Sequence, residues 1–284
     1  MRFTKMQGIG NDYVYINTME ETVADPSALA VRMSRPHYGV GADGLILIGK
    51  NEAGEFTMRE FNADGSESEM CGNGSRCVAR YLYDRGYALG EEIALRTGAG
   101  LIRVHVIPDA KTGKASRVRV DMGVPELRPE RVPVNTEARC EEGVPVTAAG
   151  QRFLAHCVSM GNPHAVIFVE DVGRVPITVL GPALEHHPVF PRRANIEFIH
   201  VTDREHLEMR VWERGSGETL ACGTGACAAL VAACLTGRSG RSAEIALRGG
   251  ALRVSWESDG HVYQEGPAEF VFEGEWPEEK NLSS

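Results

Sequence analysis

The sequence lacks the features of membrane, secreted and nucleic-acid-binding proteins. Its longest apolar run, residues 226–235, is far shorter than the roughly 20 residues that span a membrane. The N-terminal residues contain no apolar signal-peptide core. The net charge is −9 and basic runs are short, as at Arg192 and Arg193, which argues against a polyphosphate-binding surface. We therefore expect a soluble cytoplasmic protein that binds neither nucleic acid nor membranes.

Lysine is scarce, and the cysteines do not form a recognisable framework. None of the five lysines has an evident phosphate-binding context, so a Schiff base with pyridoxal phosphate is not indicated. Seven cysteines, an odd number, without a secretion signal predict reduced thiols. Cys71 with Cys77, and Cys222 with Cys227, lack the two-residue gap of paired zinc ligands. We expect no metal and no cofactor.

An internal repeat is the most informative feature that the sequence does contain. Cys71-Gly72-Asn73-Gly74 recurs as Cys222-Gly223-Thr224-Gly225, at an offset of 222 − 71 = 151 residues. The same offset aligns three further blocks, which are Gly10-Asn11 with Gly161-Asn162, Met58-Arg59 with Met209-Arg210, and Phe61 with Trp212. With 284 residues the chain is long enough for two cores. The repeat predicts two halves of similar fold.

The expected elements are many short strands and a few helices. Because they do not alternate regularly, they indicate an α+β fold rather than a doubly wound parallel sheet. Helices are expected at 26–34, 74–85, 182–187 and 225–236. We expect an N-terminal half at residues 1–123 and a C-terminal half at 124–265, divided by turn residues near Pro125. A last strand, at about 266–276, is expected to return to the first half.

The two repeated cysteines have the surroundings of proton-transfer groups. Each stands at the start of an expected helix, where unpaired N–H groups lower the pKa of a thiol. The neighbouring glycines let the same N–H groups receive a substrate carboxylate. A thiol on each side of one α-carbon suits racemisation or epimerisation without a cofactor, in a cleft that closes to exclude water. Either cysteine taken alone is better interpreted as a structural thiol.

Six longer blocks resemble the diaminopimelate epimerase family. They are GIGNDYV, VGADGLILI, FNADGSESEMCGNGSRC, SMGNPHAV, RANIEFI and WERGSGETLACGTGACA. The resemblance implies interconversion of LL- and meso-2,6-diaminopimelate, in lysine and peptidoglycan precursor synthesis, by a cofactor-independent homodimer. It also implies two pseudo-symmetric domains, each a curled, mostly antiparallel sheet around a central helix, with the active site between them.

The resemblance also implies roles for individual residues. Cys71 and Cys222 match the two proton-transfer residues, and His164 with Glu213 match groups that tune the thiols. Gly72-Asn73 and Gly223-Thr224 match the backbone cradle of the reacting carboxylate. The substrate-binding positions are matched by Asn11, Asn62, Asn162, Asn195, Glu213 and Arg214. Where some members have Gln, this chain has Gly44, so that contact is absent or supplied otherwise.

The chemistry of the substrate fits these residue types, although each has a simpler interpretation. Glu213 can bind the distal ammonium group and Arg214 the distal carboxylate, while asparagines offer both donor and acceptor. Glu213 and Arg214 also fit a solvated charge pair at a strand end. The asparagines fit turn positions, and His164 fits an ordinary strand histidine.

Two other functions are compatible with the paired thiols. A proline or hydroxyproline racemase shares the two-thiol arrangement, but the Glu-Arg-Gly run at 213–215 favours diaminopimelate. A thiol redox or sensor protein would cycle Cys71 and Cys222 through a disulfide. Solvent deuterium entering the α-carbon of an amino acid would distinguish an epimerase from the redox protein.

Overall fold

The computed structural model describes residues 1–68 and 72–277. They form two compact units. The first comprises Met1–Val120 with the segment that starts at Pro267, and the second is Asp121–Gly266. In the first unit the chain's last strand pairs with its first, so that Arg2 is opposite Glu275.

The first unit is a curled, mostly antiparallel sheet. Its strands follow the order β18, β1, β2, β3, β4, β6, β7 and β8, and the short β5 pairs with β4. Among the strand pairs of the described residues in this unit, only β2–β3 and β4–β6 are parallel. The bounds are β1 Arg2–Gly8, β2 Asn11–Asn17, β3 Gly44–Lys50, β4 Phe56–Asn62, β5 Glu67–Ser68, β6 Glu92–Thr97, β7 Gly100–Pro108, β8 Ala115–Asp121 and β18 Glu269–Glu275.

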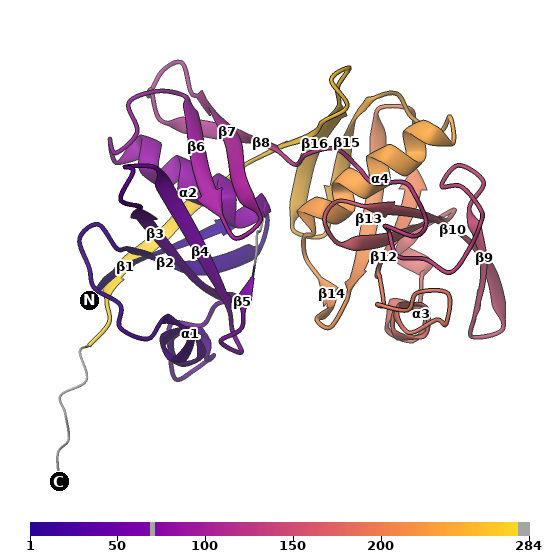
Figure 1. Cartoon of the computed structure of the whole chain (residues 1–284), viewed down its shortest axis with the longest axis horizontal. Helices are drawn as coiled ribbons and strands as arrows, with labels where there is room; N and C mark the ends of the chain where they lie inside the picture. The colour runs from indigo at the N-terminus through magenta and orange to yellow at the C-terminus, as the bar shows by residue number, and fades with distance from the viewer. Residues whose placement is uncertain (69–71, 278–284) are drawn as a thin grey trace, which may run out of the picture. The chain divides into compact units, whose positions relative to one another are not determined.

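Helices cover both faces of this sheet. Helix α2 (Gly72–Asp84) contacts β1, β2 and β7, so the sheet wraps around it (Figure 1). Helix α1 (Pro26–Ser34) packs on the other face, where Leu29 joins Leu45 and Leu47 in one core cluster. Because β3 is buried on both faces, its sequence is almost continuously apolar.

The second unit has the same architecture. Its strand order is β9, β10, β11, β12, β13, β15, β16 and β17, and the short β14 pairs with β13. Its elements are β9 Val144–Ala148, β10 Gln151–Ser159, β11 Pro163–Phe168, the 3-10 helix Val172–Arg174, α3 Ile177–Glu185, β12 Asn195–Val201, β13 His206–Glu213, β14 Gly217–Thr219, α4 Gly223–Leu235, β15 Ser242–Leu247, β16 Gly250–Trp256 and β17 Val262–Gly266.

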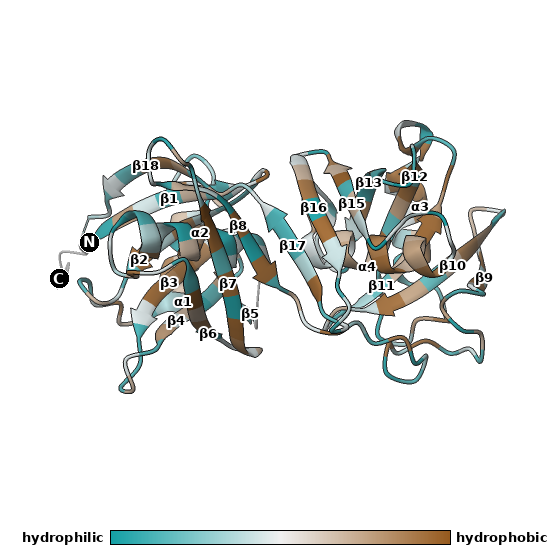
Figure 2. Ribbon diagram, turned by 90° about the horizontal axis from the view of Figure 1, so that it is seen from above, coloured by the Kyte–Doolittle hydropathy of each residue, from teal (hydrophilic) through white to brown (hydrophobic). Residues whose placement is uncertain are grey.

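Helix α4 is the centre of the second unit. It contacts β10, β11, β12, β15, β16 and β17, and every residue from Ala226 to Ala233 is fully buried. A helix that is apolar on all sides is a core helix. Hydrophilic residues interrupt hydrophobic ones along β16, as Figure 2 shows, because one face of that strand covers α4 and the other does not.

The two units repeat each other element by element. Adding 151 to the bounds of α1 gives those of α3, and adding it to the bounds of α2 gives those of α4. Strand register repeats as well, since Tyr13 is opposite Gly44 in β2–β3 and His164 is opposite Asn195 in β11–β12. The predicted α+β fold with two pseudo-symmetric halves is confirmed.

The third predicted helix was misplaced. It was expected at residues 182–187, but α3 runs over Ile177–Glu185 and contains Pro182 in its interior. A side chain at Gly181 would overlap the ring of Trp212, with its Cβ 2.4 Å from a ring carbon. The helix therefore packs against Trp212 through a glycine, and this long-range contact is not visible in the local sequence.

Candidate active site

Cys222 lies at the start of α4, where its side chain caps the helix. Its backbone is extended, with φ −129° and ψ 108°, and its Sγ accepts a hydrogen bond from the Gly225 N–H at 3.4 Å. The residue is buried, with 5% of its surface exposed. Cys71, its counterpart in the repeat, lies outside the described residues.

The glycines around Cys222 are required by close contacts. A Cβ on Gly225 would lie 2.8 Å from Glu197 Oε1 and 3.2 Å from Cys222 Sγ. A Cβ on Gly223 would lie 2.6 Å from the side-chain oxygen of Gln264. Only glycine lets the first turn of α4 approach these polar groups so closely.

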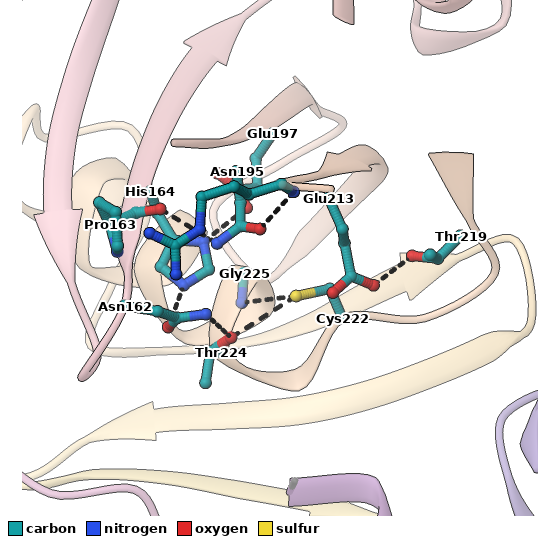
Figure 3. A network of polar contacts seen from close by, with 11 residues as sticks. Asn162, Pro163, His164, Asn195, Glu197, Glu213, Thr219, Cys222, Thr224 and Gly225 are labelled. Carbon is teal, nitrogen blue, oxygen red and sulfur yellow. Dashed lines mark hydrogen bonds and ion pairs between the residues drawn. The ribbon is translucent and has the colours of Figure 1, made fainter. Parts of the chain in front are cut away.

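A chain of polar contacts leads from a buried carboxylate to the thiol (Figure 3). His164 lies 2.7 Å from Glu197 Oε1 through Nδ1, and 2.8 Å from Asn162 Oδ1 through Nε2. Asn162 Nδ2 donates to Thr224 Oγ1 at 3.4 Å. That hydroxyl lies 3.5 Å from Cys222 Sγ. Three sequence-predicted residues, Asn162, His164 and Thr224, thus meet beside Cys222.

Glu213 is the second carboxylate at this thiol. The Thr219 hydroxyl donates a hydrogen bond to Glu213 Oε1, and the Cys222 side chain lies beside the same carboxyl group (Figure 3). Burial raises the pKa of Glu213, and the polar contacts with Thr219 and Cys222, together with the charge of His164, act against that rise. A carboxyl group with a raised pKa can hold or release a proton beside the sulfur.

Burial also raises the pKa of the Cys222 thiol, well above its usual range. The negative charges of Glu213 and Glu197 add to this increase, whereas hydrogen bonds from Thr224 and Gly225 oppose it. The N–H group at the helix N-terminus acts to lower the pKa of this thiol, as predicted, but the net shift is upward. Lost hydration and two nearby carboxylates outweigh a single N–H donor.

Asn195 fixes the turn that carries Arg214. Its Nδ2 donates to the carbonyl of Pro163 at 3.0 Å, and its Oδ1 accepts from the backbone N–H of Arg214 at 2.9 Å. The Arg214 guanidinium donates to the carbonyl of Arg192 at 3.1 Å. Asn195 and Arg214 therefore belong to the same part of the unit as Glu213.

In the first unit, the structure brings Asn11 and Asn73 together. Asn73 Nδ2 lies 3.3 Å from Asn11 Oδ1, and Asn73 Oδ1 accepts from the buried Arg76 at 2.8 Å. Asn11 Nδ2 donates to Asp43 at 2.7 Å. Burial raises the pKa of Asp43. These contacts hold two predicted substrate-binding amides in fixed orientations.

Two other predicted positions of the first unit, and Gly44, have simpler surroundings. Asn62 Nδ2 donates to the Ser66 hydroxyl at 3.0 Å. Gly72 is buried in the first turn of α2. A Cβ on Gly44 would lie 2.1 Å from the carbonyl oxygen of Phe61, so the strand has no room for a side chain at this position.

The sequence interpretation missed Glu197, Thr219 and Asp43. Glu197 had a detectable signal, because it interrupts the apolar run from Ile196 to Ile199 in a strand that is buried on both faces. A carboxylate in such a strand needs a partner. No comparable signal marks Thr219, whose contact with Glu213 depends on the β13–β14 hairpin.

Two kinds of feature are absent from residues 1–68 and 72–277. These residues contain no group of three or more histidine, cysteine, aspartate or glutamate side chains that could hold a metal ion. No helix in the same residues has the length and apolar character that a membrane crossing requires.

Solved structures of low sequence identity share the fold. A probable proline racemase from Agrobacterium radiobacter K84 superimposes with a TM-score of 0.70 at 14% identity, covering 99% of this chain and 94% of that protein. A phenazine biosynthesis protein of the PhzF family from Bacillus anthracis gives 0.67 at 15% identity, covering 96% and 98%.

Sequence relatives are much closer. The chain is 53% identical to the diaminopimelate epimerase of Acetivibrio thermocellus over 97% of its length and 98% of the relative. It is 52% identical to that of Moorella thermoacetica, over 98% and 99%. The family model for diaminopimelate epimerase matches residues 3–128 and 156–271. The predicted resemblance is confirmed, and this chain belongs to the diaminopimelate epimerase family of isomerases.

Proposed function

We propose that this protein interconverts LL- and meso-2,6-diaminopimelate by proton transfer at the α-carbon, in lysine and peptidoglycan precursor synthesis. Relatives that match nearly the whole chain carry the name of this activity. The observation that carries the proposal is the buried thiol of Cys222 at the start of α4, beside the buried Glu213 carboxyl group whose pKa is raised.

The reaction uses one thiol on each face of the α-carbon. Glu213 accepts the proton of Cys222, which leaves a thiolate and a neutral carboxylic acid. The thiolate then takes the α-hydrogen, and the electron pair of the broken C–H bond remains on the substrate. Cys71 donates a proton to the opposite face, and the reverse reaction exchanges the two roles. The raised pKa of Cys222 makes its thiolate a strong base once it forms.

The charge on the reacting carbon is stabilised by the backbone. N–H groups at Gly223 and Thr224, in the first turn of α4, are the proposed cradle for the substrate carboxylate. Gly72 and Asn73 are the proposed equivalents in α2. These donors hold the carbanion's charge without a cofactor.

The distal end of the substrate carries an ammonium group and a carboxylate. We assign the carboxylate to the Arg214 guanidinium, which exchanges its contact with the Arg192 carbonyl for the substrate. The ammonium is assigned to Glu213 in its ionised form, before Glu213 accepts the proton of Cys222. Four asparagines complete the recognition of the distal centre by offering both donors and acceptors, namely Asn11, Asn62, Asn162 and Asn195. A substrate without the distal groups leaves these polar side chains unpaired and is rejected.

We also propose that the enzyme is a cytoplasmic homodimer, as the family resemblance implies. Light scattering on a size-exclusion column tests the assembly. A mass near twice 30.9 kDa is the expected result, and a mass near 30.9 kDa contradicts it.

The direct test is incubation with LL-diaminopimelate in deuterated water. The wild-type protein should form the meso isomer with α-deuterium, and Cys71→Ala and Cys222→Ala should each lose epimerisation. If either variant keeps wild-type turnover, the two-thiol mechanism is wrong. L-Proline serves as the comparison substrate. Turnover of proline alone would replace this proposal with a proline racemase, and a reversible disulfide couple without deuterium uptake would replace it with a redox protein.

A further inference from the structure

We propose that Glu197 is a positioning residue of this reaction, which keeps His164 protonated on both ring nitrogens and so directs a chain of hydrogen-bond donors at Cys222. This inference rests on the proposed role of Cys222 in proton transfer. Glu197 does not match any site residue that the family resemblance implied.

The contact between Glu197 and His164 is completely buried. Both residues have 0% of their surface exposed, and Glu197 Oε1 lies 2.7 Å from His164 Nδ1. The second carboxylate oxygen, Oε2, has no hydrogen-bond partner. An ionised carboxylate at such a place requires a compensating positive charge. An imidazolium at His164 supplies that charge at hydrogen-bond distance.

The second ring nitrogen gives the same answer independently. His164 Nε2 lies 2.8 Å from Asn162 Oδ1, which is an acceptor. A neutral imidazole has one donor nitrogen and one acceptor nitrogen, so it can satisfy only one of these two oxygen partners. The imidazolium donates to both, and the geometry therefore points to a proton on each nitrogen.

A protonated His164 sets the direction of the remaining contacts. With Oδ1 held by His164, the Asn162 amide presents Nδ2 to Thr224 Oγ1 at 3.4 Å. The Thr224 hydroxyl then has its own hydrogen available for Cys222 Sγ, 3.5 Å away. In the proposed state, each group in the chain of contacts drawn in Figure 3 donates toward the sulfur. Such a donor stabilises the thiolate that forms during proton transfer.

Charge balance also requires the pair. A Cβ on Gly225 would lie 2.8 Å from Glu197 Oε1 and 3.2 Å from Cys222 Sγ, so the carboxylate oxygen and the sulfur are at most 2.8 + 3.2 = 6.0 Å apart. A carboxylate without a counter-ion would repel a thiolate at this range. The His164 imidazolium offsets the charge of Glu197 and leaves Glu213 as the carboxyl group that exchanges a proton with the thiol.

The corresponding pair in the first unit contains a tyrosine in place of the histidine. The position of His164 is occupied there by Tyr13, whose hydroxyl donates to the buried Glu60 at 2.8 Å. Glu60 lies on β4 opposite Ile46, and Ile46 is the repeat counterpart of Glu197. The repeat thus retains a buried carboxylate with a donor, but only the second unit pairs it with a residue that can become a cation.

The first test measures the protonation of His164 in the wild-type enzyme. Nitrogen-15 spectra of histidine-labelled protein at pH 7 should show imidazolium shifts at both ring nitrogens of His164, assigned by their loss in His164→Asn. In Glu197→Gln, the spectra should change to those of a neutral ring. A neutral His164 in the wild type, or a ring still charged in Glu197→Gln, overturns the proposal. This measurement does not depend on catalysis, so it separates the inference from the proposed function.

The second test uses isotope effects in the two reaction directions. Losing a charge-assisted hydrogen bond should lower kcat/KM of Glu197→Gln about tenfold or more. When Cys222 is the base, its proton transfer becomes more rate-limiting, so the effect of α-deuterated substrate should increase. In the reverse direction, where Cys71 removes the α-hydrogen, the substrate isotope effect should decrease. Equal isotope effects before and after the substitution, in both directions, contradict a role at Cys222.

Matched variants separate positioning from folding. Glu60→Gln makes the same change at a buried carboxylate of the first unit and should leave the His164 spectra unchanged. Glu197→Asp keeps the charge and should recover part of the activity and the charged ring.

If Glu197→Gln does not fold, Thr224→Val and Thr224→Ser replace it. The valine variant, which lacks the hydroxyl group, should reproduce the asymmetric isotope effects. The serine variant, which keeps it, should resemble the wild type. If the serine variant shows the asymmetry and the valine variant does not, the proposed chain of donors is wrong.

Discussion

At the scale of single residues, the candidate site depends on atoms that approach one another closely around Gly225. A Cβ there would lie 2.8 Å from Glu197 Oε1 and 3.2 Å from the sulfur of Cys222. We predict that Gly225→Ala destabilises the protein by about 1–2 kcal/mol, since overpacking outweighs the better helix propensity of alanine. Epimerase activity should fall at least about tenfold, because the displaced groups are Cys222 and its partner.

Gly240 provides the matched control for that substitution. A Cβ on Gly240 has nothing within 4 Å, and its backbone lies outside the left-handed region. Gly240→Ala should therefore leave both activity and the free energy of unfolding within about 0.5 kcal/mol of wild type. Urea unfolding and initial rates measure both quantities. An active, stable Gly225→Ala variant would show that the crowding around Cys222 is not important.

Glu60 makes stability depend on pH. Burial raises the pKa of this carboxyl group to about 7, and the hydrogen bond from Tyr13 only partly opposes the shift. Because the folded-state pKa lies above the unfolded-state value, the folded protein binds more protons. The contribution of Glu60 is complete below the unfolded-state pKa of about 4.5 and decreases as the pH rises through about 7.

Glu60→Gln should remove this dependence. Between pH 5 and 8, we expect the stability of the variant to increase by about 2 kcal/mol relative to wild type, because glutamine never ionises. Urea unfolding at several pH values gives the difference. A difference that stays constant with pH would mean that Glu60 ionises normally. Tyr13→Phe removes the opposing hydrogen bond, so it should raise the pKa of Glu60 further.

At the scale of elements, helix α4 gives Cys222 two separable roles. Its Sγ caps the helix by accepting from the Gly225 N–H, and the same atom is the proposed base. Serine is a good N-cap residue, but its hydroxyl is a much weaker acid than a thiol. Cys222→Ser should keep the cap, whereas Cys222→Ala should lose about 1 kcal/mol of stability.

Both substitutions should reduce epimerisation at least about 100-fold, as expected when a general base is removed. Thermal or urea unfolding measures the cap, and the deuterium experiment measures the chemistry. Equal stability of the serine and alanine variants would show that capping by Cys222 contributes little. Substantial turnover by the serine variant would show that a thiol is not required.

Three helices show why helix signals depend on context. The glycine-rich starts of α2 and α4 were recognised from sequence because their signal is local, a small-residue turn followed by a helical stretch. The start of α3 was missed because Pro182 resembles a helix beginning. The helix begins earlier, at Ile177, where packing of Gly181 against Trp212 favours it. The two-residue β5 and three-residue β14 are too short to leave a pattern.

At the scale of the whole molecule, the C-terminal strand is part of the first unit. Strand β18 pairs with β1, and the backbone carbonyls of Pro267 and Ala268 accept hydrogen bonds from Arg76 and Arg80 of α2. Both arginines are on the central helix of the unit. Removal of the chain after Gly266 would therefore expose a sheet edge and leave buried Arg76 without this carbonyl.

We predict that a chain truncated after Gly266 loses protection from hydrogen exchange in residues 1–120 and retains it in 121–266. Hydrogen exchange followed by mass spectrometry measures each unit separately. Val271→Thr, on a strand position that is 54% exposed, keeps the pairing and should retain the wild-type pattern. Uniform protection of the truncated chain would mean that β18 is dispensable, and uniform loss would mean that the units fold only together.

The sequence by itself determined the duplicated architecture, the α+β class and the family. Local patterns specify these features, such as the short strands and the two CGxG turns. The offset of 151 residues between the repeats is also detectable without coordinates. Asn162, His164, Glu213 and Thr224 were also predicted as site residues, because each lies in a sequence block that resembles the family.

Only the tertiary structure decided how these groups act on one another. His164 and Glu197 are 33 residues apart and meet because β11 and β12 pair in parallel, a register that no local pattern specifies. The pKa of Cys222 is raised and not lowered, contrary to the expectation, for the same reason. A helix start is a local feature, whereas burial beside Glu197 and Glu213 is produced by the folding of separate strands around α4.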